Sequence, residues 1–206
     1  SIGAEAWPFP IPLVKEDKGW RFAVEEGIDE ILNRRIGANE LQAIAVLEAF
    51  PEAQRQYASQ DRNGDGVLEY AARLLSSAGT HDGLYWPASQ GEEGDESPFG
   101  PLVAEASEYM KARSSGQSYH GYRFRVLTTQ GKEAAGGAYD YAINGRLLAG
   151  AALLAWPETY GQTGVMTIMV NQNGVLYQRD LGEGTAEAVV KMTSFNPDEG
   201  WTAVED

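Results

Sequence analysis

One nine-residue stretch combines side-chain types and spacing suited to a metal ion: Asp61-Arg62-Asn63-Gly64-Asp65-Gly66-Val67-Leu68-Glu69. Oxygen ligands at its first, third and fifth positions, a glycine at the sixth and a backbone carbonyl at the seventh repeat the first half of a calcium-binding loop. We therefore predict Ca²⁺ as a ligand, with the carbonyl of Val67 and four side chains as its donors: Asp61, Asn63, Asp65 and Glu69.

The second half of the calcium pattern is absent. Position twelve, where an EF-hand carries a bidentate glutamate, is Ala72, so the loop is not an EF-hand. Asn, Asp and Gly also tolerate left-handed backbone conformations, and the same residues form ordinary solvated turns between helices. The sequence thus leaves two interpretations of the loop open, a calcium site and a turn.

A histidine supplies the second candidate for chemistry. His120 stands where a polar linker meets a strand-like run, and imidazole can act as acid or base near neutral pH. Asp140, on a neighbouring run, is the carboxylate predicted to orient it. No serine or threonine lies in a nucleophile motif. The alternative interpretation is a histidine that hydrogen-bonds a turn, and we expect a non-catalytic protein.

Aromatic residues concentrate in the middle of the chain. Rings with hydroxyl tips are typical of grooves that bind sugars or peptides, and equally of a core between a sheet and a helix. The predicted ligand-binding set is Tyr85, Trp86, Tyr122, Tyr139, Tyr141, Trp156 and Tyr160.

Composition narrows the classes of partner. Sixteen Lys and Arg against 30 Asp and Glu give a formal net charge of −14, which repels nucleic acid and anionic membrane surfaces. The chain has no cysteine, which excludes disulfides, thiolate nucleophiles and cysteine-based metal sites. No apolar run approaches the roughly 20 residues of a membrane-spanning helix. We expect a protein or polymer partner, no nucleic acid and no membrane span.

The residue pattern of the N-terminal half predicts a hairpin followed by helices. Alternation over 11–24 around Asp17-Lys18-Gly19 predicts the hairpin. Helical spacing begins at Ile28, with Gly37 as its predicted stop. Asn39-Glu40 resembles a capping box that opens a second helix, which Pro51 kinks or restarts. A short helix is predicted over 70–75.

The C-terminal half predicts an antiparallel meander, because short apolar runs alternate with turns. A helix is predicted before it, over 101–111, and another after it, over 185–192. The two strongest predicted hairpin turns are Asn144-Gly145 and Asn173-Gly174. The predicted strands are 122–127, 139–143, 147–155, 165–170 and 175–179.

The overall prediction is an α+β fold in which N-terminal helices pack on a C-terminal antiparallel β-meander. We expect residues 27–206 to form one α+β domain. Residues 1–26 are interpreted as a hairpin left from a truncated upstream domain, because a lone hairpin is marginal in water and must pack on something.

Several long strings resemble the bacterial family called domain of unknown function 2950. They are Trp7-Pro8-Phe9-Pro10-Ile11-Pro12-Leu13-Val14, Glu30-Ile31-Leu32-Asn33-Arg34-Arg35-Ile36-Gly37, Asp82-Gly83-Leu84-Tyr85-Trp86-Pro87, His120-Gly121-Tyr122, Gly136-Gly137-Ala138-Tyr139-Asp140-Tyr141 and Thr163-Gly164-Val165-Met166-Thr167. Members of that family are usually longer at the N-terminus, carry a secretion signal and have no established activity. The resemblance implies an exported protein, periplasmic or secreted.

A looser likeness concerns layout. A helix after Asn39-Glu40 followed by a meander with Ala155-Trp156-Pro157 and Tyr160-Gly161 is similar to the globular heads of type IV pilins and pseudopilins. The long apolar helix with which those proteins begin is missing here. Together these observations predict an extracytoplasmic, non-catalytic module that binds a partner protein or a cell-envelope polymer, with a structural Ca²⁺. The alternative is a cell-envelope hydrolase that uses His120 and Asp140.

Overall fold

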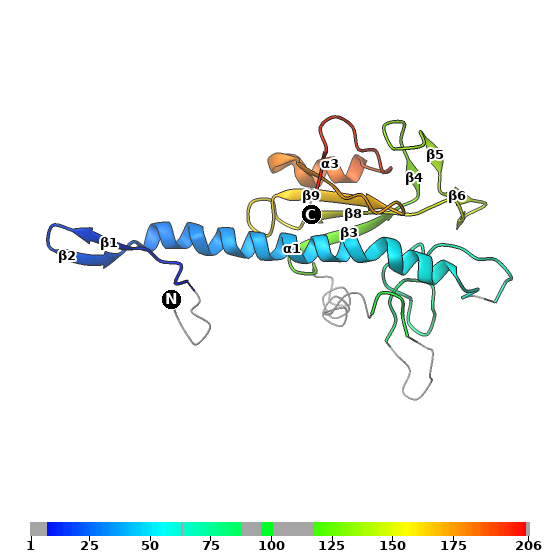
Figure 1. Ribbon diagram of the computed structural model, residues 1–206, viewed down its shortest axis with the longest axis horizontal. Coiled ribbons are helices and arrows are strands. Elements are labelled where there is room, and N and C mark those ends of the chain that lie inside the picture. The colour runs from blue at the N-terminus through cyan, green and yellow to red at the C-terminus, as the bar shows by residue number, and fades with distance from the viewer. Residues whose placement is uncertain (1–7, 63, 88–95, 101–117, 205–206) are drawn as a thin grey trace.

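The computed structural model describes residues 8–62, 64–87, 96–100 and 118–204 (Figure 1). Two predictions therefore fall outside the described residues: the helix over 101–111 and the calcium ligand Asn63.

The N-terminal hairpin is confirmed. Strands β1 (Leu13–Glu16) and β2 (Gly19–Phe22) pair antiparallel, with Leu13 opposite Phe22 and Lys15 opposite Trp20. The hairpin lies beyond one end of the helix that follows it, far from the main sheet (Figure 1). It forms the tip of the molecule rather than part of its core.

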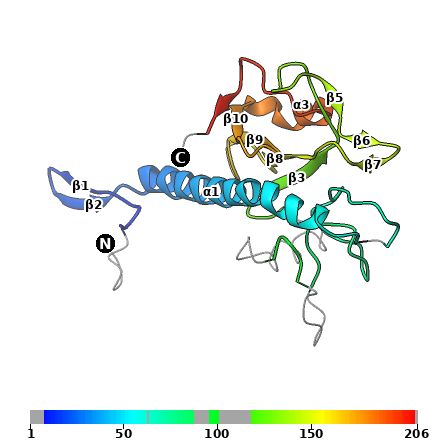
Figure 2. The same cartoon turned by 45° about the vertical axis from the view of Figure 1, so that its right-hand side comes forward.

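One helix, α1 (Val24–Ala58), replaces the two that the sequence predicted. Its 35 residues extend about 50 Å at 1.5 Å per residue. The predicted stop at Gly37 is wrong, because the helix continues through it, and Pro51 lies inside the helix, buried against the core. The half of α1 nearer the hairpin projects away from the sheet, and the other half packs on it (Figures 1 and 2).

The residues read as a capping box make tertiary contacts instead. Asn39 Nδ2 donates to the carbonyl of Thr163 at 2.8 Å, and Glu40 Oε1 accepts the N–H groups of Val165 and Met166 at 2.8 and 3.0 Å. These bonds hold α1 to the start of a strand more than 120 positions away. Long-range anchoring outweighs the local helix-start signal here.

The main sheet is antiparallel with the strand order β11-β10-β9-β8-β3. These five strands are β3 (Tyr122–Leu127), β8 (Ala152–Pro157), β9 (Met166–Asn171), β10 (Tyr177–Asp180) and β11 (Thr202–Ala203). The predicted α+β class, helix on antiparallel sheet, is confirmed.

The sheet is covered on both faces. Helix α1 packs against β9, β8 and β3, and helix α3 (Thr185–Lys191), which follows the 3₁₀ turn η1 (Gly182–Gly184), lies on the opposite side (Figure 1). Residues 152–155 of β8 are all fully buried, because neighbouring side chains point to opposite, covered faces. Leu47 and Phe50 supply the helical side of this core.

Short strand pairs continue from the end of β3. They are β4 (Thr129–Gln130) with β5 (Tyr139–Asp140), and β6 (Ala142–Ile143) with β7 (Arg146–Leu147). Asn144 and Gly145, with φ of 53° and 82°, form the predicted turn between β6 and β7. The predicted helix over 70–75 is wrong, because the N–H of Tyr70 bonds to the carbonyl of Leu147 and Leu75 bridges to Tyr85.

Candidate functional site: an apolar arm and a polar pocket

The projecting N-terminal part of the molecule carries an exposed apolar surface. We call residues 8–36 the arm. In the hairpin, Trp20 and Phe22 lie two residues apart and so share one face with Leu13, which is paired with Phe22. The ring of Phe9 meets that of Phe22 edge to face at 5.6 Å between centroids. One face of the hairpin is therefore a row of large apolar side chains.

The first turns of α1 also carry exposed apolar side chains. Val24, Ile28 and Ile31 follow the i, i+4, i+7 spacing that places side chains on one side of a helix. The seven large apolar side chains of hairpin and helix are between 41% and 64% exposed. Apolar side chains exposed in such numbers on one element mark interaction surfaces.

The hairpin is fastened to α1 and continues its direction. The N–H of Ala23 donates to the carbonyl of Pro12 at 2.9 Å, and Arg34 Nη1 donates to the carbonyl of Pro8 at 2.6 Å. Gly27 lets Ile11 approach the helix so closely that a Cβ at that position would lie 2.7 Å from Ile11 Cγ1. These contacts make the arm one unit of hairpin and helix.

The acidic loop follows the other end of α1. The carboxylate of Asp61 accepts N–H groups of Gly64, Asp65 and Gly66 at 2.7–3.3 Å, and Asp65 Oδ1 accepts the N–H of Val67 at 3.0 Å. Both side chains therefore shape the loop that they belong to, as in the turn interpretation.

A cation from another part of the chain already sits in the loop. Arg146, on the β6–β7 hairpin, forms an ion pair with Asp65. The pKa of its guanidinium is raised by the hydrogen bond to Asp65 and further by the charges of Asp65, Glu69 and Asp61. Among the residues that the structure describes, no three acidic or histidine side chains gather as a metal site. Calcium binding stays a prediction, with Arg146 as the competitor for the carboxylates.

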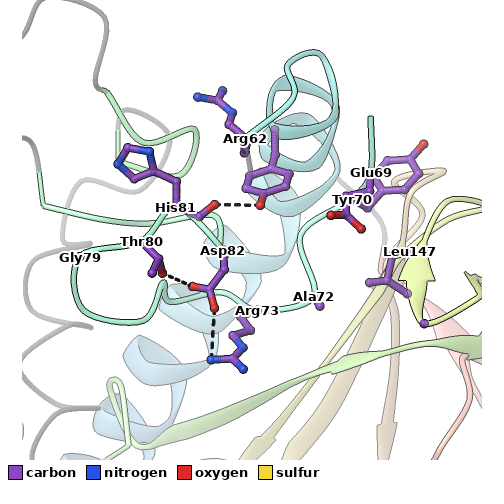
Figure 3. A pocket seen from close by; sticks show the side chains of 12 residues that line it. Arg62, Glu69, Tyr70, Ala72, Arg73, Gly79, Thr80, His81, Asp82 and Leu147 are labelled. Atoms are coloured by element: carbon purple, nitrogen blue, oxygen red, sulfur yellow. Dashed lines mark hydrogen bonds and ion pairs between the residues drawn. The ribbon is translucent and has the colours of Figure 1, made fainter. Parts of the chain in front are cut away.

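A pocket of about 640 Å³ opens beside this loop (Figure 3). It is bounded by the end of α1, the segment 79–82 and the turn between β6 and β7, and its size falls within the range of small-molecule sites. Titratable side chains line it: Tyr57, Arg62, Glu69, Tyr70, Arg73, His81 and Asp82.

The pocket wall is held by hydrogen bonds. Tyr57 donates its hydroxyl to the carbonyl of His81 at 2.8 Å, and burial, aided by nearby Glu69 and Asp82, raises the pKa of Tyr57 (Figure 3). Burial alone would raise the pKa of Asp82, but hydrogen bonds from residues 77 and 80 and the ion pair with Arg73 bring it below its ordinary value. Asp82 is thus an ionised structural anchor.

Arginine and aromatic rings stack at one rim of the pocket. The Arg62 guanidinium carbon lies 5.8 Å from the Tyr57 ring centroid and 5.4 Å from that of Trp86. His81 stacks on Trp86 at 4.3 Å. Cation–π and stacking contacts of this kind order the side chains that a ligand would meet first.

The two residues of the predicted catalytic pair lie apart. His120 and Gly121, with φ of 44° and 71°, form the two-residue turn between Tyr119 and Tyr122, whose N–H and carbonyl groups bond reciprocally. Asp140 pairs with Thr129 beyond the other end of β3. Because β3 lies between them and a strand rises about 3.3 Å per residue, His120 and Asp140 are separated by about 20 Å. The position of His120 fits the turn interpretation.

The predicted aromatic set is not a single groove. Trp86, Tyr122 and Tyr141 are buried in the core, whereas Tyr139 is exposed. The remaining three, Tyr85, Trp156 and Tyr160, are partly buried. The residues of the arm were not predicted as a site. Their signal was the demand that the hairpin pack on something, since β1 and β2 stay largely exposed among the described residues.

None of the helices in the described ranges is both long and apolar enough to cross a bilayer. A family model described as "Protein of unknown function (DUF2950)" matches residues 1–204. No curated protein and no solved structure matches the chain, so the pilin-head likeness remains a prediction.

Proposed function

The chain belongs to the DUF2950 family of proteins of unknown function, and we propose that it is an exported, non-catalytic module that binds a protein partner through the arm. The observation that carries the proposal is the row of large apolar side chains exposed on β1, β2 and the first turns of α1. Export is the family trait implied by the resemblance, and it would place the partner in the cell envelope.

The physical state of the hairpin supports this proposal. All eight residues of β1 and β2 except Val14 are exposed. A two-stranded hairpin is marginally stable in water on its own, and burial of its apolar face supplies the stabilisation that it lacks. A docked protein surface provides that burial. The separation of His120 from Asp140 supports a binding role over hydrolysis, which needs the pair within hydrogen-bond reach.

The pocket supports a second candidate function, binding of a cell-envelope polymer. Its volume suits a short polar segment, and His81 and Arg62, which line it, both contact the buried ring of Trp86. This role is tested by titrating the protein with a soluble peptidoglycan fragment and following tryptophan fluorescence. Saturable quenching of tryptophan fluorescence that disappears in Trp86→Phe would support this role, and quenching that survives in Trp86→Phe would place binding elsewhere.

The arm proposal is tested by photo-crosslinking in cells that produce the protein. A photoreactive phenylalanine analogue replaces Trp20 in one variant and Val190, which is 71% exposed on α3, in the control. The proposal expects a discrete protein adduct from position 20 and none from position 190. No adduct at position 20, or the same adducts at both positions, would contradict it.

A further inference from the structure

We infer that the protein bound by the arm is a second copy of this chain, paired with α1 antiparallel to α1 of the first copy. This inference rests on the proposed function, because it names the partner of the same surface. It is argued from charge, area and the spacing of the apolar residues.

Charge is the first argument. The arm carries five basic and six acidic side chains, a net charge of −1, whereas the whole chain carries −14. Two acidic molecules repel each other least where this near-neutral surface meets its copy. No strongly basic partner is needed to offset the charge of the arm.

The order of the charges selects the antiparallel arrangement. Glu25, Glu26 and Asp29 occupy the first turns of α1, and the basic pair Arg34-Arg35 follows two turns later. Antiparallel helices that cross between Asp29 and Glu30 bring Arg34 of one copy level with Glu25 of the other. Parallel helices would align like charges, which costs free energy.

The apolar residues fit the same crossing point. Ile28 and Ile31 lie symmetrically about it, so that Ile28 of each copy faces Ile31 of the other. This is the self-complementary contact of a two-fold symmetric dimer.

The available area matches what a dimer needs. The exposed parts of the seven large apolar side chains sum to roughly 600 Å² per copy, because the aromatic side chains have full areas of about 150–250 Å² and the aliphatic ones less. Stable interfaces bury about 800 Å² per partner. The arm alone therefore supplies most of a standard interface.

Single-cysteine crosslinking tests the inference, because the chain has no cysteine of its own. In the proposed dimer the two Ile28 residues are offset by about 4–5 Å along the helices, so that their Cα atoms lie roughly 6–7 Å apart across axes about 8–10 Å apart, whereas the two Trp20 residues lie roughly 30 Å apart or more. A disulfide needs Cα atoms within about 7 Å. On oxidation, Ile28→Cys is expected to form a covalent dimer, and Trp20→Cys and the control Val190→Cys are expected to stay monomeric.

Sedimentation velocity of the cysteine-free chain accompanies this test. The expected species has twice the chain mass, and Ile28→Glu is expected to raise the dissociation constant about 30-fold, as for an interface hot spot. Thermal melts check that the variants fold.

Two outcomes overturn the inference. Crosslinking of both Ile28→Cys and Trp20→Cys would show parallel pairing, and a monomer at all concentrations with no crosslink would show that no second copy binds. In the monomer case, an adduct of a different protein at position 20 in cells would leave the proposed function standing.

Discussion

Glu40 on α1 and Met166 at the start of β9 are joined through a single carboxylate oxygen. Glu40 Oε1 accepts the N–H of Met166 at 3.0 Å and also the N–H of Val165 at 2.8 Å. The hydroxyl of Tyr122 donates to the carbonyl of Met166 at 2.8 Å. This junction fixes the point at which α1 leaves the sheet, so it determines where the arm begins.

Replacement of Glu40 by alanine is expected to destabilise the fold by about 2–3 kcal/mol, because two backbone donors lose a charged acceptor. Glu40→Gln keeps an acceptor oxygen in the same place and is expected to cost about 1 kcal/mol or less. Urea denaturation of the two variants measures the difference. Equal losses in both would show that the charge, rather than the acceptor oxygen, stabilises the junction.

Two glycines in α1, Gly27 and Gly37, allow a controlled test of how the hairpin is attached to the helix. A Cβ at Gly37 would meet no atom within 4 Å, so Gly37→Ala is expected to stabilise the protein by about 0.5–1 kcal/mol through helix propensity. A Cβ at Gly27 would collide with Ile11, so Gly27→Ala is expected to displace the hairpin and weaken self-association.

Thermal melts and sedimentation of both alanine variants check this pair. Equal gains in melting temperature with unchanged self-association would mean that the hairpin is not held against α1 at Gly27.

The Arg146–Asp65 ion pair predicts how the acidic loop responds to calcium. Removal of the guanidinium in Arg146→Ala takes away a cation that faces the carboxylates of Asp61, Asp65 and Glu69. Ca²⁺ is therefore expected to raise the melting temperature of Arg146→Ala more than that of the wild type, since a ligand of the folded state stabilises by mass action. If Ca²⁺ shifts neither protein, the loop is only a turn.

Alkaline pH is expected to destabilise the core through Tyr141. Burial raises its pKa from about 10 to about 12, and its hydroxyl donates to Gln130 Oε1 at 2.8 Å. A folded-state pKa above the unfolded value gives stability that is complete below pH 10 and is lost as the pH rises towards 12. The loss from this group is on the order of 2–3 kcal/mol.

Tyr141→Phe removes the titrating group and tests this assignment. Its free energy of unfolding, measured by urea denaturation between pH 9 and pH 12, is expected to fall less steeply than that of the wild type. A slope equal to the wild-type slope would assign the alkaline transition to other groups, among them Tyr122, whose pKa burial also raises.

Local patterns predicted the elements whose determinants are local. Strand β3 has the predicted bounds, and Asn144-Gly145 makes the predicted turn, because positive φ is a property of the turn residues themselves. The predicted break at Gly37 failed because Asn39 and Glu40 bind residues more than 120 positions away, which no local window contains. The cation at Asp65 was missed for the same reason, since Arg146 comes from a distant hairpin.

The arm could be predicted only in part. Alternation of apolar and polar residues over 11–24 predicted the hairpin and its apolar face. The same alternation is expected whether that face packs on its own chain or on another protein, so the sequence does not distinguish the two. That distinction depends on where α1 ends and on which of its halves the sheet covers. The structure supplies both.

Hydrogen exchange of the hairpin amides, followed over about two decades of protein concentration, tests the central claim most directly. If the arm is a docking surface for a second copy, the amides of β1 and β2 are expected to become more protected as concentration rises, while those of β8 stay unchanged. Fast exchange of the hairpin at every concentration would contradict the account.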